Sequence, residues 1–288
     1  MNLPGLKTFI AILETGSLVK ASERLHVSQS TITARLKTLE SELGQTLFKR
    51  DKSGVSLTGA GARFRRYAET MVDLWRQAKQ ETSLPDGVDT IVNLGCHIDL
   101  WLKTGHPFMQ RLRMNYPKLA LSAWPGKHAE LDEWMSTGLC DAILTYKPNP
   151  QDRQTAHFLF DESLVLVSDR PHTPSRFDPE YIYVDAGEDF GRRHTAVYAD
   201  AGIAKVSFGC ASWALDFILT NGGSAYLPKV YVEAPLKNRT LFRVAEAPVF
   251  QRAAFLVVND DASKNWQWLG KELSQLSEPS KSDAVDSN

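Results

Sequence analysis

The chain has 288 residues, of which 43% are hydrophobic and 23% are charged, as expected for a globular protein with two or three cores. No apolar run approaches the roughly 20 residues that cross a bilayer, and no secretion signal is visible at the amino terminus. These features argue against membrane and secreted proteins. The three cysteines are few and widely spaced, which favours a reducing compartment. A cytoplasmic protein without a membrane partner is therefore expected.

The overall charge of −1 conceals an asymmetry. Residues 1–82 contain 13 Lys and Arg against 8 Asp and Glu, a balance of +5, whereas residues 83–288 contain 20 against 26, a balance of −6. A basic front end joined to an acidic remainder is typical of a nucleic-acid-binding module attached to another domain.

The first 43 residues carry the pattern of three short helices. Apolar residues at helical spacing in residues 3–13 predict the first helix, which Gly16 ends. Ser17 and Ser28 stand where the N-caps of the second and third helices belong, and a very short connection separates these two helices. In the third helix the predicted buried stripe is Ile32, Leu36, Leu39 and Leu43.

The exposed face of the third helix suggests DNA recognition. Glutamine can bond adenine in two places, serine and threonine reach base edges or phosphates, and arginine suits guanine or phosphate. In a helix-turn-helix, the second helix of the pair enters the major groove. The predicted base-reading residues are Gln29, Ser30, Thr33 and Arg35, and Ser28 and Thr31 are predicted to hold phosphates. Taken alone, this stretch also fits an ordinary capped surface helix.

A basic hairpin is predicted directly after these helices, within residues 46–58. Ser53-Gly54 is a turn signal between two short strand-like segments. Lys49, Arg50 and Lys52 would project from the hairpin toward the phosphate backbone, where contacts set affinity and orientation more than sequence preference. A solvated turn with incidental charge is the alternative.

This region resembles the LysR-type transcriptional regulators. The matching residues are Phe9, Gly16-Ser17, Ala21, Leu25, Val27-Ser28-Gln29, Leu36, Leu39-Glu40, Leu43-Gly44, Leu47-Phe48, Arg50, Leu57-Thr58 and Ala60-Gly61. The resemblance covers almost the whole chain, more weakly in its second half, and implies a winged helix-turn-helix, a linker helix and an effector-sensing domain. Ser30 departs from the proline that the family often has, and Ala34-Arg35 departs from arginine-glutamine. The family's average base preference is therefore not transferred.

Residues 59–83 predict one long linker helix with a single apolar stripe. A helix about 35 Å long at 1.5 Å per residue cannot bury this stripe on the small domain of residues 1–58 alone. Antiparallel packing against the same helix of a second subunit is expected, and the resemblance implies dimers that commonly pair into tetramers. The predicted dimerisation residues are Phe64, Met71 and Trp75. Burial against the chain's own second half is the alternative.

Residues 90–274 alternate strands and helices, which predicts a mostly parallel α/β sheet. Two such lobes with two crossover strands resemble the periplasmic-binding-protein-like effector domain of the same family. The family's Gly-rich segment before a Leu-Pro pair matches Gly223 and Leu227-Pro228, and Asn221 stands where glycine is expected because asparagine tolerates positive φ. The polar residues 275–288 are predicted to form a disordered tail. The fold class is thus α/β behind a winged helix-turn-helix.

The cleft between the lobes is the predicted effector site, because ligands of such sheets bind outside the carboxyl ends of strands. The predicted effector-binding residues are Cys96, His97, Ile98, Trp124, Lys127, His128, Gly187, Cys210 and Ser212. Many family members have serine or threonine at the first of these positions, which suits a carboxylate, so the Cys96–Asp99 stretch argues against that ligand class. Trp101 and Trp124 favour a bulky or aromatic ligand, although tryptophan is more often part of the core.

Other classes of protein compete with this interpretation. A metal site could draw on Cys96, His97, His106, His128 and Cys140, but no pair has C-x-x-C or H-x-x-x-H spacing, so no metal or cofactor is expected. A thiol switch at Cys140 or Cys210 lacks a nearby basic cluster. No enzyme is expected, since G-x-S-x-G, P-loop and G-x-G-x-x-G motifs are absent from the sequence. A purely architectural DNA-binding protein would not need the long acidic part.

The predicted function is a LysR-type regulator that binds an inverted-repeat operator as an oligomer and responds to a small molecule. An effector-independent repressor is the alternative. The expected partners are double-stranded DNA, a second copy of the chain and an unknown effector, with RNA polymerase as a further candidate. The segments YAETMVDLW (67–75) and YVDAGEDF (183–190) resemble a branch of the family that includes a repressor of the flagellar master operon, which implies motility genes as one target.

Overall fold

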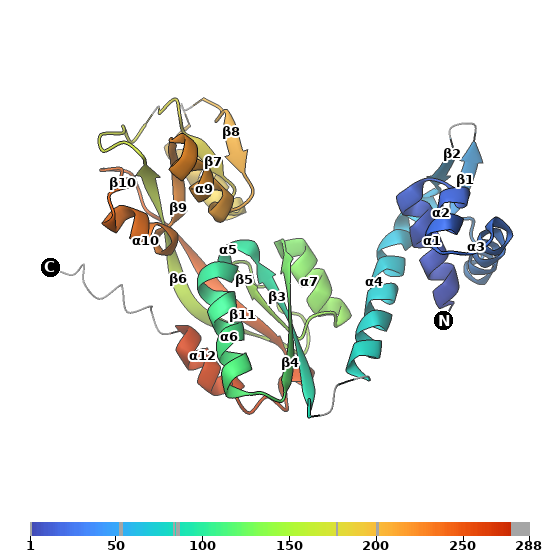
Figure 1. Ribbon diagram of the computed structural model, residues 1–288. Coiled ribbons are helices and arrows are strands. Elements are labelled where there is room, and N and C mark those ends of the chain that lie inside the picture. Colours follow the sequence, from blue (N-terminus) through green and yellow to red (C-terminus); the bar gives the residue numbers. More distant parts are fainter. Residues whose placement is uncertain are drawn as a thin grey trace. The chain divides into compact units, whose positions relative to one another are not determined.

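The computed structural model describes residues 2–51, 54–82, 84, 87–176, 178–199 and 202–277 (Figure 1). The chain divides after Gly87 into an amino-terminal and a carboxy-terminal unit. No helix in these ranges is both long and apolar enough to cross a membrane. The prediction of a disordered tail over residues 275–288 is wrong for residues 275–277, because they complete a helix that ends at Ser277 and buries Leu276 in the core. Residues from 278 onward lie outside the described part of the chain.

The amino-terminal unit is a winged helix-turn-helix that continues into a long helix. Its elements are α1 (Leu3–Thr15), α2 (Leu18–Arg24), α3 (Gln29–Leu43), β1 (Phe48–Asp51), β2 (Gly54–Leu57) and α4 (Gly59–Glu81). Gly16 ends α1 with a φ of 63°, and the Ser28 hydroxyl accepts the Thr31 N–H at 3.2 Å to cap α3. The predicted caps and helix order are therefore confirmed.

The core of this unit forms around Phe9, whose ring contacts Phe48 at 5.0 Å and Phe64 at 5.3 Å between centroids. The Glu40 carboxylate accepts the N–H groups of Leu47 at 2.7 Å and Phe48 at 3.3 Å, which ties α3 to the wing. The prediction that Leu43 is buried is wrong. It is the last residue of α3 and 41% exposed, because it lies beyond the cluster of buried side chains.

The carboxy-terminal unit has two lobes joined by two long strands, β6 (Gln154–Ser168) and β11 (Phe250–Asn259), as Figure 1 shows. Lobe one contains β3 (Thr90–His97), α5 (Ile98–Leu100), a π-helical turn (Trp101–Gly105), α6 (His106–Asn115), β4 (Leu119–Gly126), α7 (His128–Thr137), β5 (Ala142–Thr145), α11 (Asp260–Ser263) and α12 (Leu269–Ser277). Lobe two contains β7 (Ile182–Val184), α8 (Glu188–Val197), β8 (Val206–Phe208), α9 (Ala211–Asn221), β9 (Ser224–Pro228), α10 (Lys229–Lys237) and β10 (Phe242–Arg243).

One sheet runs through both lobes in the order β10-β6-β11-β5-β3-β4, with β9 also paired to β6. Its β3 is parallel to β4 and β5, whereas β6 and β11 are antiparallel to their neighbours. The sheet is therefore mixed, and the prediction of a mostly parallel sheet is wrong because the crossover strands return through it. Along β5, Leu144 joins the core that includes α6 and α12, and Ile143 joins the core under α7. Helices thus cover both faces in lobe one.

One local prediction in this unit is wrong. Asn221 does not take a positive φ, because it is the last residue of α9, and the positive angles belong to Gly222 at 78° and Gly223 at 117°. A Cβ on Gly223 would also lie 2.8 Å from the Glu180 carbonyl oxygen. Trp266 and Trp268 are buried, and their rings stack just before α12 begins.

Candidate functional site

The exposed face of α3 forms a shallow concave surface. Its lining residues are Gln29, Ser30, Thr33, Ala34 and Lys37. The side chains of Gln29 and Lys37 make no hydrogen bond within the described part of the chain, so their polar groups are available to a partner. Lys37, absent from the predicted base-reading set, thus joins three of its members.

The other predicted α3 residues lie around this surface. The Ser28 hydroxyl is 2.8 Å from the hydroxyls of both Ser30 and Thr31, so the three groups form one cluster at the start of the helix. Arg35 does not line the concave surface. It shares a flank of α3 with Thr31, because residues four apart lie on the same side of a helix. The structure therefore separates Arg35 from Gln29 and Thr33.

The wing is an antiparallel pair in which Lys49 faces Ser56 and Arg50 faces Val55. The Lys49 side chain is exposed and belongs to no ion pair in the described residues, so it is free for a phosphate. Only the backbone of Arg50 is described, and Lys52 lies outside the described residues. Of the three predicted phosphate-binding residues of the wing, Lys49 is therefore the one whose side chain the structure describes.

The predicted dimerisation residues on α4 have different surroundings. Phe64 and Met71 pack against the core of the amino-terminal unit. Trp75, further along the same helix, is 42% exposed, and Tyr67 is 51% exposed. The first half of the stripe thus contributes to the unit's own core, and Trp75 remains the candidate for contact with a second subunit.

The structure brings two predicted effector-binding residues together where β3 and β4 end in lobe one. The rings of His97 and His128 stack with centroids 4.8 Å apart, and Tyr146 meets His97 edge-on at 5.2 Å. His128 Nδ1 lies 3.1 Å from the Thr145 hydroxyl. Burial lowers the pKa of His97 to about 4 against the opposing effect of Asp99, and burial also lowers the pKa of His128. Both imidazoles are therefore neutral near pH 7.

Beside these rings lies a buried ionic cluster that the sequence did not predict. The Arg252 guanidinium donates to Glu162 at 2.7 Å and to Asp99 at 3.3 Å, and it covers the Tyr146 ring at 3.7 Å. The side chains of Asp99, Glu162 and Arg252 are 1%, 6% and 9% exposed. Burial raises the pKa of Glu162, although Arg252 acts in the opposite direction. The cluster holds two carboxylates around one guanidinium.

Asp99 also connects the two lobes. It stands in α5 of lobe one, and its Oδ1 accepts the N–H of Ala211, the first residue of α9 in lobe two, at 2.8 Å. The hydroxyl of Tyr231, in α10 of lobe two, donates to the Asp99 carbonyl at 2.6 Å. These bonds hold the two lobes against each other.

The remaining predicted effector residues lie around this cluster. Cys96 and Cys210 are buried, and burial raises the pKa of the Cys96 thiol to about 12. Cys210 precedes α9, where its sulfur lies 3.6 Å from the Ser212 hydroxyl. Ile98, Trp124 and Lys127 are exposed, the last two at the end of β4 and just beyond it, and Gly187 precedes α8 with a φ of 102°. Because both thiols are buried, they are poorly accessible to an oxidant, which does not favour a redox switch.

The order of the domains and the architecture of both units agree with known proteins. Residues 3–62 match the family described as bacterial regulatory helix-turn-helix protein, lysR family, and residues 87–275 match the LysR substrate binding domain. The chain belongs to the LysR family. The prediction of a LysR-type DNA-binding transcriptional regulator with an effector-binding domain is confirmed.

Relatives of this LysR-family regulator include the HTH-type transcriptional regulators HdfR of Yersinia enterocolitica and Yersinia pestis. Each is 28% identical over 240 residues, which are 80% of this chain and 82% of the relative. The crystal structure of CbnR, a LysR family transcriptional regulator, has a TM-score of 0.70 at 18% identity and covers 97% of this chain and 100% of CbnR. Vibrio fischeri DarR in complex with DNA has a TM-score of 0.59 at 18% identity, covering 96% and 98%. These two structures share the fold.

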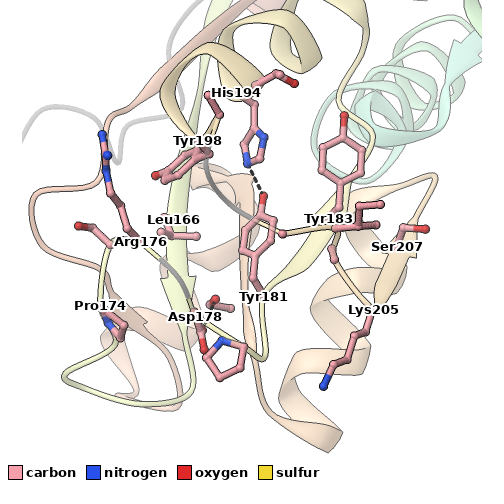
Figure 2. Close-up of a pocket in the computed structure, with 18 residues that line it drawn as sticks. Leu166, Pro174, Arg176, Asp178, Tyr181, Tyr183, His194, Tyr198, Lys205 and Ser207 are labelled. Atoms are coloured by element: carbon pink, nitrogen blue, oxygen red, sulfur yellow. Dashed lines mark hydrogen bonds between the residues drawn. The ribbon is translucent and has the colours of Figure 1, made fainter.

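A separate cavity of about 680 Å³ lies within lobe two of the regulator (Figure 2). Its walls include Tyr181, Tyr183, His194 and Tyr198, and the Tyr181 hydroxyl forms a hydrogen bond with His194 at 2.8 Å. None of the predicted effector residues lines this cavity. In the described part of the chain, no group of three or more His, Cys, Asp or Glu side chains could hold a metal ion.

The cluster residues escaped the sequence prediction for a physical reason. Glu162 and Arg252 lie on different crossover strands and face each other across the β6–β11 ladder, so no local spacing relates them to Asp99. The available signal was a charge inside an otherwise apolar strand, as in FDESLVLVS and FQRAAFLVV. A charge in such a place requires a buried partner.

Proposed function

We propose that this LysR-family regulator binds an inverted-repeat operator as a dimer or a dimer of dimers, and that a small molecule in the interlobe cleft changes that binding. The observation that carries the proposal is the concave polar surface of α3, where Gln29 and Lys37 have unoccupied polar groups. The wing then supplies phosphate contacts beside that helix. The proposed compartment is the cytoplasm, with RNA polymerase as a candidate partner.

Replacing Gln29 with alanine tests the base-reading role. Gln29→Ala should relax preference at one base pair of each half-site, at a cost of roughly 1–3 kcal/mol for the preferred base. The measurement is selection of bound sequences from a random library by wild-type and variant protein. Glu42→Ala, an exposed change on the last turn of α3, is the matched control and should keep the wild-type motif. An unchanged motif for Gln29→Ala would remove this residue from the base-reading set.

Replacing Lys49 with alanine tests the wing. Since phosphate contacts carry little sequence information, Lys49→Ala should weaken binding to all sequences about equally. The slope of log affinity against log salt should become shallower by about 1 for each phosphate that the lysine no longer neutralises, or about 2 for a dimer. Titrations of one specific and one unrelated fragment at several salt concentrations give both quantities. A weakening confined to the specific fragment would contradict the assignment.

A second candidate function is an effector-independent repressor, which the Asp99 bonds favour because they join the two lobes through the protein's own groups. Thermal-shift screening of small metabolites separates the two, because a ligand that binds the folded state raises its stability by mass action. The targets proposed from the resemblance to the flagellar branch are motility genes, and genome-wide mapping of bound DNA tests them.

A further inference from the structure

We propose that the cavity of about 680 Å³ within lobe two is a ligand site in its own right, for a small molecule that carries a planar aromatic ring and an anionic group (Figure 2). Proteins bind cofactors and drug-sized molecules in pockets of about 300–1,000 Å³. The cavity shares no lining residue with the predicted interlobe effector site. The proposal therefore stands apart from the proposed function.

One wall of the cavity consists of aromatic rings held by β7 and α8. Tyr181, just before β7, stacks on His194 with centroids 5.6 Å apart, and its hydroxyl lies 2.8 Å from His194 Nε2. The Tyr198 ring lies 4.8 Å from the same imidazole, and its hydroxyl is 2.6 Å from that of buried Tyr226. Hydrogen bonds at their edges thus fix these rings. Fixed aromatic rings favour a planar ring as their partner, through offset or edge-on contact.

The segment that carries Pro174 and Pro179 forms another part of the lining. Next to Pro179, the Asp178 carboxylate accepts from the Arg170 guanidinium at 2.8 Å and from the Ser224 hydroxyl of β9 at 2.5 Å. The Asp178 side chain is 5% exposed. The protein's own groups therefore fasten this part of the lining to the sheet, and Arg170 balances the charge of Asp178.

The remaining charges of the lining are positive. Arg176 and Lys205 both line the cavity, and neither belongs to an ion pair within the described residues. Figure 2 shows these two side chains to either side of Tyr181. His194 is neutral near pH 7 because burial lowers its pKa, so it adds no charge. Since a cavity lined by one sign of charge attracts the opposite sign, an anionic group is the expected partner of Arg176 or Lys205.

The rim of the cavity adds an apolar requirement. Ile203 lines the cavity and is 100% exposed in the described structure. A ring bound beside the tyrosines would shield this side chain from water, which is favourable for an apolar surface. A small inorganic anion would leave Ile203 exposed and the aromatic wall without a partner. The lining therefore favours an aromatic anion over an inorganic one.

Binding of four probes to the full-length protein, measured by ligand-observed NMR titration, tests this chemical class. The probes 2-naphthoate and 2-naphthyl phosphate join a flat ring to an anion and distinguish a carboxylate from a phosphate. The amide 2-naphthamide lacks the charge, and cyclohexanecarboxylate lacks the aromatic ring. At least one anionic naphthyl probe should bind with a dissociation constant of about 1 mM or below, and about tenfold more tightly than the last two probes. If neither anionic naphthyl probe binds at about 10 mM, ten times that constant, the proposal is refuted.

A substitution that fills the cavity tests where the probe binds. Thr195 is an exposed residue of α8 that lines the cavity, so Thr195→Trp places a bulky side chain at the site. Ala196, the next residue of the same helix, is also exposed but does not line the cavity, which makes Ala196→Trp the matched control. Thr195→Trp should weaken binding by more than about tenfold, the equivalent of one lost contact to a charged group, and Ala196→Trp should bind as wild type does. Equal binding by the two variants would place the probe elsewhere on the chain and overturn the proposal.

Removal of the cations tests the charge without filling the cavity, and it remains informative if Thr195→Trp does not fold. The double variant Arg176→Gln/Lys205→Gln should bind the anionic probe at least about tenfold more weakly than wild type, with no change for 2-naphthamide. The control Lys237→Gln/Arg243→Gln removes two exposed charges that do not line the cavity and should have little effect. Equal weakening by both double variants would reduce the effect to net charge and contradict the site. These titrations need no DNA, so their failure leaves the proposed function untouched.

Discussion

Replacing Arg252 with methionine is expected to lower the free energy of unfolding by about 3–5 kcal/mol, the usual cost of removing one partner from a buried ion pair. The substitution leaves Asp99 and Glu162 buried with no cation between them, and both side chains are at most 6% exposed. Urea denaturation at pH 7.5, followed by tryptophan fluorescence, measures the change. The cost arises from the stranded carboxylates, since methionine fills much of the same volume.

The pH dependence of this variant has a defined sign. Burial already raises the pKa of Glu162, and Arg252 opposes that rise, so its removal should raise the pKa further. Between the unfolded pKa of about 4.3 and this higher folded value, the folded state binds more protons than the unfolded state. The stability of Arg252→Met should therefore fall as pH rises through the folded pKa, and part of the deficit should be recovered near pH 5.5.

Arg192→Met is the matched control, because Arg192 pairs with Asp189 at 3.0 Å on the surface, where its side chain is 80% exposed. Exposed pairs contribute about 0–1 kcal/mol, so little change is expected. If Arg252→Met proved no less stable than Arg192→Met at pH 7.5, the buried cluster would have no structural importance.

Replacing Trp75 with glutamate is expected to convert the proposed dimer into a monomer at micromolar concentration. Trp75 is 42% exposed on α4 and lies in line with Phe64 and Met71, which the amino-terminal unit buries itself. A charge on this stripe would have to be desolvated in a two-helix interface, which is unfavourable. Light scattering coupled to size-exclusion chromatography measures the change in mass.

The same substitution should alter DNA binding. If each winged domain touches about four phosphates, a dimer touches about eight and has a salt slope of roughly −7, and a monomer has about half that slope. Thr70→Glu, on another face of the same helix, should keep the dimer and the full slope. A Trp75→Glu protein that remains dimeric would place the subunit interface elsewhere.

The amino-terminal unit could be predicted from sequence because its determinants are local. Gly16 ends one helix and Ser28 caps another through groups at most four residues away, and Phe9 needs only helical spacing to reach the core. The two incorrect predictions in this unit concern single side chains on α3. Leu43 continues the apolar period of α3, but it lies beyond the core side chains that could cover it and is therefore exposed. Arg35 lies on a different flank of the helix from Gln29.

In the carboxy-terminal unit, local pattern could predict strands and helices but not their partners. Apolar runs predict β3, β5 and β11 equally well whether the sheet is parallel or mixed, since period and composition do not encode direction. The pairing of β11 with β5 and β6 joins segments that are far apart in the sequence, so no local pattern predicts it. For this reason the sequence predicts a mostly parallel sheet. The positive φ predicted at Asn221 fails for a local reason, because α9 includes Asn221 and the positive angles belong to Gly222 and Gly223.

By itself, the sequence determined that a basic, capped helix-turn-helix precedes an acidic two-lobed α/β domain, because caps, periodicity and charge act within a few residues. It also placed His97 at the end of β3 and His128 just after β4, and these two rings stack in the structure. Only the tertiary structure decided which charged side chains are buried near these rings. Asp99, Glu162 and Arg252 come from three distant segments, and an ionic cluster exists only when folding removes water from all three at once.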